Sequence, residues 1–424
     1  MKRILWCVLV IVLAMGCLPA KGFAKDCEFE FYYQKIDRVE QVNNPEPKGW
    51  WEKAKAVVKS GLNTVARVWE KEVTRNFLPG EGEKTWYSEK DHNLAYKVSR
   101  VKVRNEAHLL ELMGAAGDES KLTEGQKALL EVYRHSKSQA LKDRLPYSFR
   151  SDVKVLLTDT TGFDDEKKYP NIEKDFWPYS SGFAISMNSN HFNYPGGYDT
   201  AKSTFIHEFS HSMDHGISEF IKPYGADGSH YTNELTKSRA SFVEGWAEFN
   251  QMLDSPQDAS MRKRLLKVVR VEKEDGKYDD IPIDSPKLSG EDLTHVEGLD
   301  ALVLYRLSQE CQNGREKVFK TFVDTNYPWR SLKTYLKGFV KNNPGDAKKA
   351  AAILDEVMVG KLSDAQMKEF LGDSAGVQGY LNARLAAKFP QFAPASSATP
   401  IFDFIKILGP VSVIASGTNP FENH

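Results

Sequence analysis

The chain has 424 residues, of which 41% are hydrophobic and 27% are charged, and its formal net charge is −1. This length predicts more than one domain, and the composition is typical of globular proteins. Because the charge is almost balanced, a surface that binds polyanions is not expected, and neither is a nucleic-acid partner.

The first residues have the order of a secretory signal peptide. Basic residues precede an apolar run at 4–15, and the small residues Gly22 and Ala24 suit a signal peptidase. We therefore predict a signal peptide over 1–24 and export to the periplasm or the cell exterior. The stretch that ends at Cys17 partly resembles a lipobox, so lipoprotein anchoring there stays open. The apolar run is short for an uncleaved membrane anchor, and the apolar stretch at 401–415 is interrupted by Gly409 and Pro410, so the mature chain should have no transmembrane segment.

The next part of the chain, residues 25–150, is predicted to be an N-terminal helical region. Apolar residues recur at helical spacing over 50–77, over 106–113 and after Thr123. After this region the pattern changes. Alternating residues around 153–157 and 183–187 predict two strands of a small twisted sheet.

His207, Glu208 and His211 form an HExxH motif directly after these strands. Residues four apart lie on one face of a helix, so both imidazoles can reach a single tetrahedral Zn²⁺. Glu208 is rotated by about 100° from His207, which places it beside the metal rather than on it. This is the position of a general base that takes a proton from zinc-bound water. The alternative is that both histidines are ordinary polar residues of a helix.

A second helical pattern, from about Lys237 to Leu253, contains the sequence Glu-Gly-Trp-Ala-Glu-Phe. An HExxH helix followed by such a helix resembles the gluzincin metallopeptidases. The resemblance implies that Glu244 is the third metal ligand and that Glu248 orients a ligand histidine. Gly245 and the nearby alanine are small, which would let the two helices approach closely.

The motif helix is locally similar to the anthrax lethal factor-like endopeptidases, and the second helix is similar to the bacterial collagenases. In the lethal factor-like enzymes a tyrosine about two turns before the glutamate ligand helps to stabilise the oxyanion. Here that stretch reads Lys-Ser-Arg at 237–239, so His230 and Tyr231 are the nearest candidates for this role.

The resemblance implies a zincin-like catalytic domain over 151–255. Helical segments beyond it, among them one around 261–269, predict a C-terminal helical region over 256–392, which is followed by a tail over 393–424. The predicted fold class is α+β and mainly helical, with the small sheet, the active-site helix and the glutamate helix between helical regions.

Two cysteines, Cys27 and Cys311, lie outside the predicted signal peptide. An even pair in an oxidising compartment predicts a disulfide between them. Two unpaired thiols are the alternative, because the sequence does not give the distance between the two residues.

The function that the resemblance implies is an exported zinc metallopeptidase acting on a peptide or protein substrate. We expect an extended substrate to lie along the strand Gly182–Asn188 as an added strand of the sheet. Glu208 would then take a proton from zinc-bound water and pass it to the leaving amine. A catalytically silent zinc-binding module of the same fold is one alternative. An exported helical protein with an accidental motif is another.

Overall fold

The computed structural model describes most of the chain between residues 28 and 388. The predicted signal peptide, Cys27, the helix expected over 50–77, His230 and the tail over 393–424 lie outside the described residues. The described ranges are 28–41, 80–88, 94–147, 152–163, 172–176, 178–180, 184–214, 231–236, 238–255, 263–273, 275–324 and 331–388, together with residues 169 and 260.

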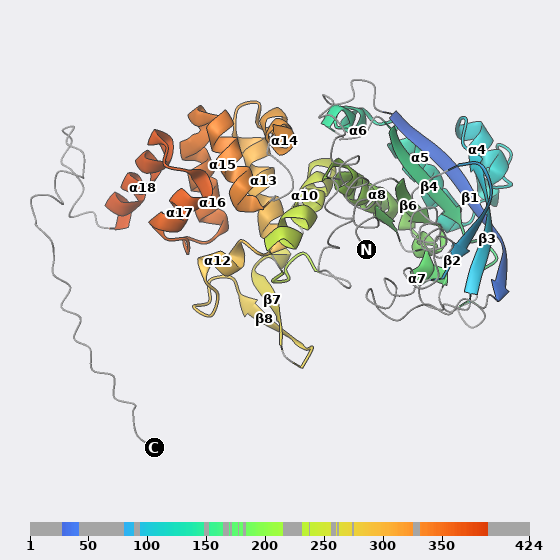
Figure 1. The fold of residues 1–424 in the computed structure, drawn as a ribbon, viewed down its shortest axis with the longest axis horizontal. Helices are drawn as coiled ribbons and strands as arrows, with labels where there is room; N and C mark the ends of the chain where they lie inside the picture. The colour runs from blue at the N-terminus through green and yellow to red at the C-terminus, as the bar shows by residue number, and fades with distance from the viewer. Residues whose placement is uncertain are drawn as a thin grey trace, which may run out of the picture.

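A six-stranded mixed sheet lies at one end of the molecule, in the strand order β2-β3-β1-β4-β6-β5 (Figure 1). Its strands are β1 (Glu28–Gln41), β2 (Gly82–Tyr87), β3 (Leu94–Lys102), β4 (Asp152–Asp159), β5 (Tyr179–Ser180) and β6 (Ala184–Asn188). β1 runs antiparallel to β3 and parallel to β4, and β4 runs parallel to β6. β1, the first strand of the described residues, therefore lies inside the sheet.

The prediction of an N-terminal helical region is wrong for β1, β2 and β3. Three consecutive aromatic residues of β1, Phe31, Tyr32 and Tyr33, are all buried, because both faces of the strand are covered. Such a strand shows no alternation of polar and apolar residues, so its periodicity does not reveal it. The boundary predicted at residues 150 and 151 is not a structural division either, since β1 pairs with β4 across it.

The two strands predicted just before the motif are confirmed as β4 and β6. At the end of β4 the buried Asp159 accepts hydrogen bonds from the Tyr33 hydroxyl at 2.5 Å and from the Gln126 side chain at 2.8 Å. These bonds join β1, β4 and the helix that begins after Thr123.

The helices of this part are α4 (Glu106–Leu112), α5 (Glu124–His135), α6 (Gln139–Lys142), α7 (Ile172–Asp175) and α8 (Gly197–Asp214). Of these, α5 and α8 pack on strands of the sheet, and α4 packs on α5. The helices predicted over 106–113 and after Thr123 are confirmed as α4 and α5. The Thr123 side chain and Gln126 form a capping box at the start of α5. α8 carries the HExxH motif and lies beside α5 and β6.

The rest of the described chain is mainly helical. It comprises α10 (Ser238–Asp254), α12 (Gly290–Leu293), α13 (Glu297–Glu310), α14 (Gly314–Asp324), α15 (Leu332–Asn342), α16 (Ala347–Val357), α17 (Asp364–Leu371) and α18 (Ala375–Lys388). Two strands, β7 (Val268–Glu272) and β8 (Tyr278–Pro282), form a hairpin, so the helix expected around 261–269 is wrong at its end. Short 3₁₀ turns lie at Glu119–Lys121, Leu145–Tyr147, Asn190–Phe192 and Pro344–Asp346.

α8 and α10 lie between the sheet at one end of the molecule and the helices α13 to α18 at the other (Figure 1). One hydrophobic cluster runs through all three parts, with Val155 from the sheet, Phe205 from α8, Trp246 from α10 and Phe319 from α14. The predicted class, α+β and mainly helical with a small sheet, is confirmed. No helix among the described residues has the length and hydropathy of a membrane span.

Candidate metal centre

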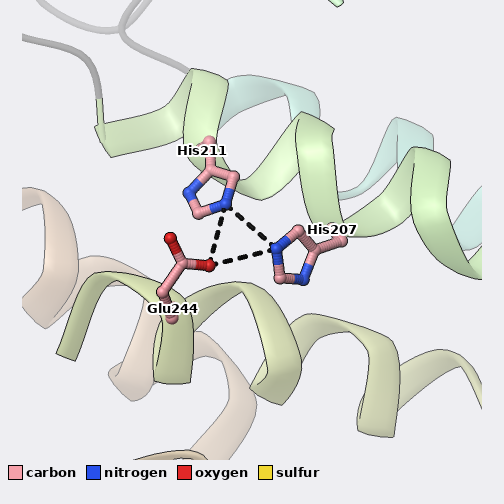
Figure 2. Close-up of side chains that lie close together, drawn as sticks. All are labelled: His207, His211 and Glu244. Carbon is pink, nitrogen blue, oxygen red and sulfur yellow. Dashed lines mark hydrogen bonds and ion pairs between the residues drawn. The ribbon is translucent and has the colours of Figure 1, made fainter. Parts of the chain in front are cut away.

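α8 holds its motif in place by burying one face. Phe205, Ile206 and Phe209 lie in the hydrophobic core, and the helix begins at Gly197, where a β-carbon would lie 2.1 Å from the carbonyl oxygen of Phe192. The sharp approach of the chain into α8 therefore requires glycine at 197. His207 and His211 lie one turn apart on the side of α8 that faces α10 (Figure 2).

Three side-chain atoms of the predicted ligands meet at one point (Figure 2). The Nε2 atoms of His207 and His211 are 3.1 Å apart. Glu244 Oε2 lies 3.1 Å from the first and 3.2 Å from the second. The structure thus brings together His207 and His211 of α8 with Glu244 of α10, as the sequence analysis expected.

These distances suit a tetrahedral metal ion. Nitrogen and oxygen ligands about 2.0–2.1 Å from zinc lie about 3.3–3.4 Å from one another in a tetrahedron, close to the distances found here. His207, His211 and Glu244 are therefore the residues that would hold such an ion. The chemistry of the three side chains supports the same conclusion, because imidazole nitrogens and a carboxylate oxygen are ligands that zinc commonly takes.

Charge at the centre is partly shielded from water. The side chains of His207, His211 and Glu244 are 19%, 13% and 13% exposed. Burial alone would raise the pKa of Glu244, but His211 and His207 outweigh it and hold that pKa well below its usual value. Glu244 is therefore an anion at neutral pH, which is the form that binds a metal ion.

Glu208 lies beside the triad and is not part of it. Only 9% of this residue is exposed, and burial raises the pKa of its carboxyl group above the usual value, although His207 and His211 oppose the shift. The backbone N–H of Ser180 in β5 donates a hydrogen bond to the same carboxyl group. A carboxylate with a raised pKa in such a place is a candidate proton acceptor.

β5 is the edge strand of the sheet on the side of β6, and the prediction that the strand Gly182–Asn188 forms this edge is wrong. β6 pairs on one side with β4 and on the other with β5, which runs antiparallel to it. Because β5 has only two residues, its periodicity could not indicate a strand. Ser180 connects this edge directly to Glu208.

Glu248, one turn after Glu244, is buried and accepts a hydrogen bond from the Thr232 hydroxyl at 2.5 Å. Its predicted part in orienting a ligand histidine stays a prediction. Thr232 was not foreseen, since it lies in an irregular segment outside both helices. α8 and α10 pack closely, as predicted, but Gly245 is not at their contact, because it faces α13.

Of the two candidates for the oxyanion partner, His230 and Tyr231, the structure describes only Tyr231. His230 lies outside the described residues. Tyr231 is 47% exposed, and its ring covers the Arg270 guanidinium, 4.3 Å from the ring centre. The Tyr278 ring lies against the same cation at 5.3 Å. Stabilisation of an oxyanion by His230 or Tyr231 stays a prediction.

Cys311 is a free, buried cysteine at the end of α13, where the sequence analysis expected a disulfide. Its predicted partner Cys27 lies outside the described residues, so the pairing stays a prediction without support from the structure. Burial raises the pKa of the Cys311 thiol to about 11, which keeps it protonated at neutral pH.

Comparison with known proteins does not add to this geometry. No protein-family model, curated protein or solved structure matches the chain.

Proposed function

We propose that the protein is an exported zinc metallopeptidase of the gluzincin type, with His207, His211 and Glu244 as ligands. The observation that carries the proposal is the meeting of two Nε2 atoms and one carboxylate oxygen within 3.2 Å of one another. A zincin-like arrangement is supported by α8 beneath a sheet whose edge strand, β5, is antiparallel to its neighbour. The proposal of export is based on the predicted signal peptide over 1–24. Lipoprotein anchoring at Cys17 remains the alternative to cleavage of that peptide.

Zinc suits the donor set better than a hard cation. Two imidazoles and one carboxylate in a nearly equilateral arrangement are typical of catalytic zinc, whereas calcium and magnesium prefer six or more oxygen ligands. When bound, zinc would acidify a water molecule and polarise the carbonyl group of a peptide.

Glu208 would move the proton. Its carboxyl group is buried beside the triad, and it must be ionised to accept a proton from the attacking water. After attack on the carbonyl carbon, the same group would donate this proton to the amine that leaves. The N–H of Ser180 would hold the carboxylate in the orientation for both transfers.

A substrate would lie along β5. An extended peptide could pair with this short edge strand through main-chain hydrogen bonds, and Ser180 brings the edge next to Glu208. β5 therefore takes the place of the predicted strand Gly182–Asn188 as the edge along which a substrate would lie.

A catalytically silent zinc-binding module of the same fold is the second candidate. It would need the triad but not Glu208. The burial of a carboxylate costs free energy, and a site that only holds metal gains nothing from that cost. The position of Glu208 therefore favours the enzyme.

The experiment that tests the proposal has two readouts on purified full-length protein. Metal analysis should find about one zinc per chain after supplementation, and a mixed peptide library should be cleaved until a chelator is added. Zinc without cleavage would favour the silent module. Failure to bind zinc would contradict both.

A further inference from the structure

The first turns of α13 touch α10 directly beside Glu244. A β-carbon placed on Gly245 would lie 2.7 Å from the carbonyl oxygen of Glu297 and 2.8 Å from the β-carbon of Asp300. Both distances are shorter than atoms of folded proteins allow. The backbones of the two helices are therefore in contact here, and a side chain at position 245 would push them apart.

A hydrogen bond fixes the same contact one turn earlier on α10. The Ser241 hydroxyl donates to Asp300 Oδ2 at 3.1 Å, and both residues are fully buried. Ser241 and Gly245 lie on either side of Glu244 in the sequence. α13 thus holds α10 at two points, Ser241 and Gly245, that flank Glu244 in the sequence.

A second connection runs from α13 to Glu248. The Gly298 N–H donates to the carbonyl oxygen of Thr232 at 2.8 Å, and a β-carbon at Gly298 would lie 2.5 Å from Thr232 Cγ2. The Thr232 hydroxyl in turn donates to the Glu248 carboxylate. The absence of a side chain at 298 allows this chain of contacts to form.

We propose that residues 297–301 at the start of α13 are a positioning element of the metal centre. They act on Glu244 through Gly245 and Ser241, and on Glu248 through Thr232. The inference rests on the proposed metal site and adds a part of the molecule that touches neither metal nor substrate. Partners of this kind matter because small shifts of a ligand weaken the hold on a metal, and their loss typically costs about 10–100-fold in affinity.

Two substitutions in the full-length protein test the two connections separately. Gly245→Ala should separate α10 from α13, and Thr232→Val keeps the shape of the side chain but removes the donor to Glu248. Gly379→Ala in α18 is the matched control, because a β-carbon there meets nothing within 4 Å. Thr232→Ser is the conservative variant that restores the donor.

The readouts are zinc affinity, measured by competition with a chelator, and the visible absorption spectrum of the Co²⁺-loaded protein, which reports ligand geometry. We expect Gly245→Ala and Thr232→Val to lose about 10–100-fold in zinc affinity and to alter the spectrum. Gly379→Ala and Thr232→Ser should match the wild type. Thermal unfolding of the metal-free proteins shows whether each variant is folded.

The outcomes separate this inference from the proposed function. Folded Gly245→Ala and Thr232→Val proteins with wild-type affinity and spectrum would overturn the positioning element but leave the metal site standing. If Gly245→Ala does not fold, Ser241→Ala, which removes the hydrogen bond to Asp300, takes its place as the test of the Glu244 connection, and wild-type affinity and spectrum in that variant would overturn it. A wild-type protein that binds neither Zn²⁺ nor Co²⁺ would overturn both proposals.

Discussion

Replacing Glu208 with glutamine should abolish peptide hydrolysis while the metal stays bound. Glutamine has nearly the same shape, and its amide oxygen can still accept the N–H of Ser180. His207, His211 and Glu244 keep their positions, since Glu208 is not one of the three converging ligands. The substitution therefore removes a proton acceptor and little else.

The size of the effect follows from the role. An amide cannot take a proton from water, so the general-base contribution of about 10²–10⁴ in rate should be lost, which equals about 2.7–5.5 kcal/mol of barrier. Stability should not fall. Burial raises the pKa of Glu208, so its charge is a cost to the metal-free fold at neutral pH, and neutral glutamine avoids that cost.

The assay compares wild type, Glu208→Gln and a control on the best peptide from a library, with zinc content measured for each. Asp355→Asn is a matched control, because Asp355 is a carboxylate with the same 9% exposure but lies on α16, hydrogen-bonded to Tyr380. It should cleave like the wild type. A zinc-loaded Glu208→Gln protein that cleaves at a near wild-type rate would refute the assignment of the base.

Further outcomes follow from other residues. Glu244→Ala should release zinc on dialysis while its fold persists, and full retention of the metal by mass spectrometry would remove Glu244 from the ligands. Burial raises the pKa of Asp300 well above its usual value, so the folded protein binds this proton more tightly than the unfolded chain, and stability falls as pH rises toward the folded-state pKa. Asparagine at this position cannot titrate, so the melting temperature of Asp300→Asn relative to that of the wild type should increase as the pH rises. A difference in melting temperature that does not change with pH would contradict this. Trp246→Ala removes a fully buried side chain and should cost about 3–5 kcal/mol in urea unfolding. Thiol counting on denatured, unreduced mature protein should find none if Cys27 and Cys311 are paired, and two if the free Cys311 of the structure is the stable state.

The sequence predicted the parts of the site that depend on local geometry. Residues four apart lie on the same face of any α-helix, so the shared face of His207 and His211 required only that this segment be helical. Glu244 was identified from a resemblance, and the structure brings it to the two histidines. The approach of α10 to α8 could not be derived from spacing, since it depends on packing between distant segments.

What the sequence missed depends on contacts far apart along the chain. β1 is buried on both faces, and nothing in its composition names β3 and β4 as its neighbours. The contact of α13 with α10 was also missed, although a glycine inside a helical pattern was a visible signal. Such a glycine weakens a helix and often has a packing reason. Gly245 and Gly298 each have such a packing reason, because a side chain at either position would clash with a neighbouring segment.

The place of β1 in the sheet has a consequence for synthesis of the protein. Tyr33 of β1 and its partner Asp159 at the end of β4 are separated by 126 residues. At about 5–20 residues per second, a ribosome would need about 6–25 s to supply that partner after β1 is made. Both edges of this aromatic strand are unpaired until β3 is made, and the edge that pairs with β4 stays unpaired for the whole interval. An unpaired edge of β1 could pair with another chain during this interval, which is one route to aggregation, so folding of β1 should be delayed until β4 is available.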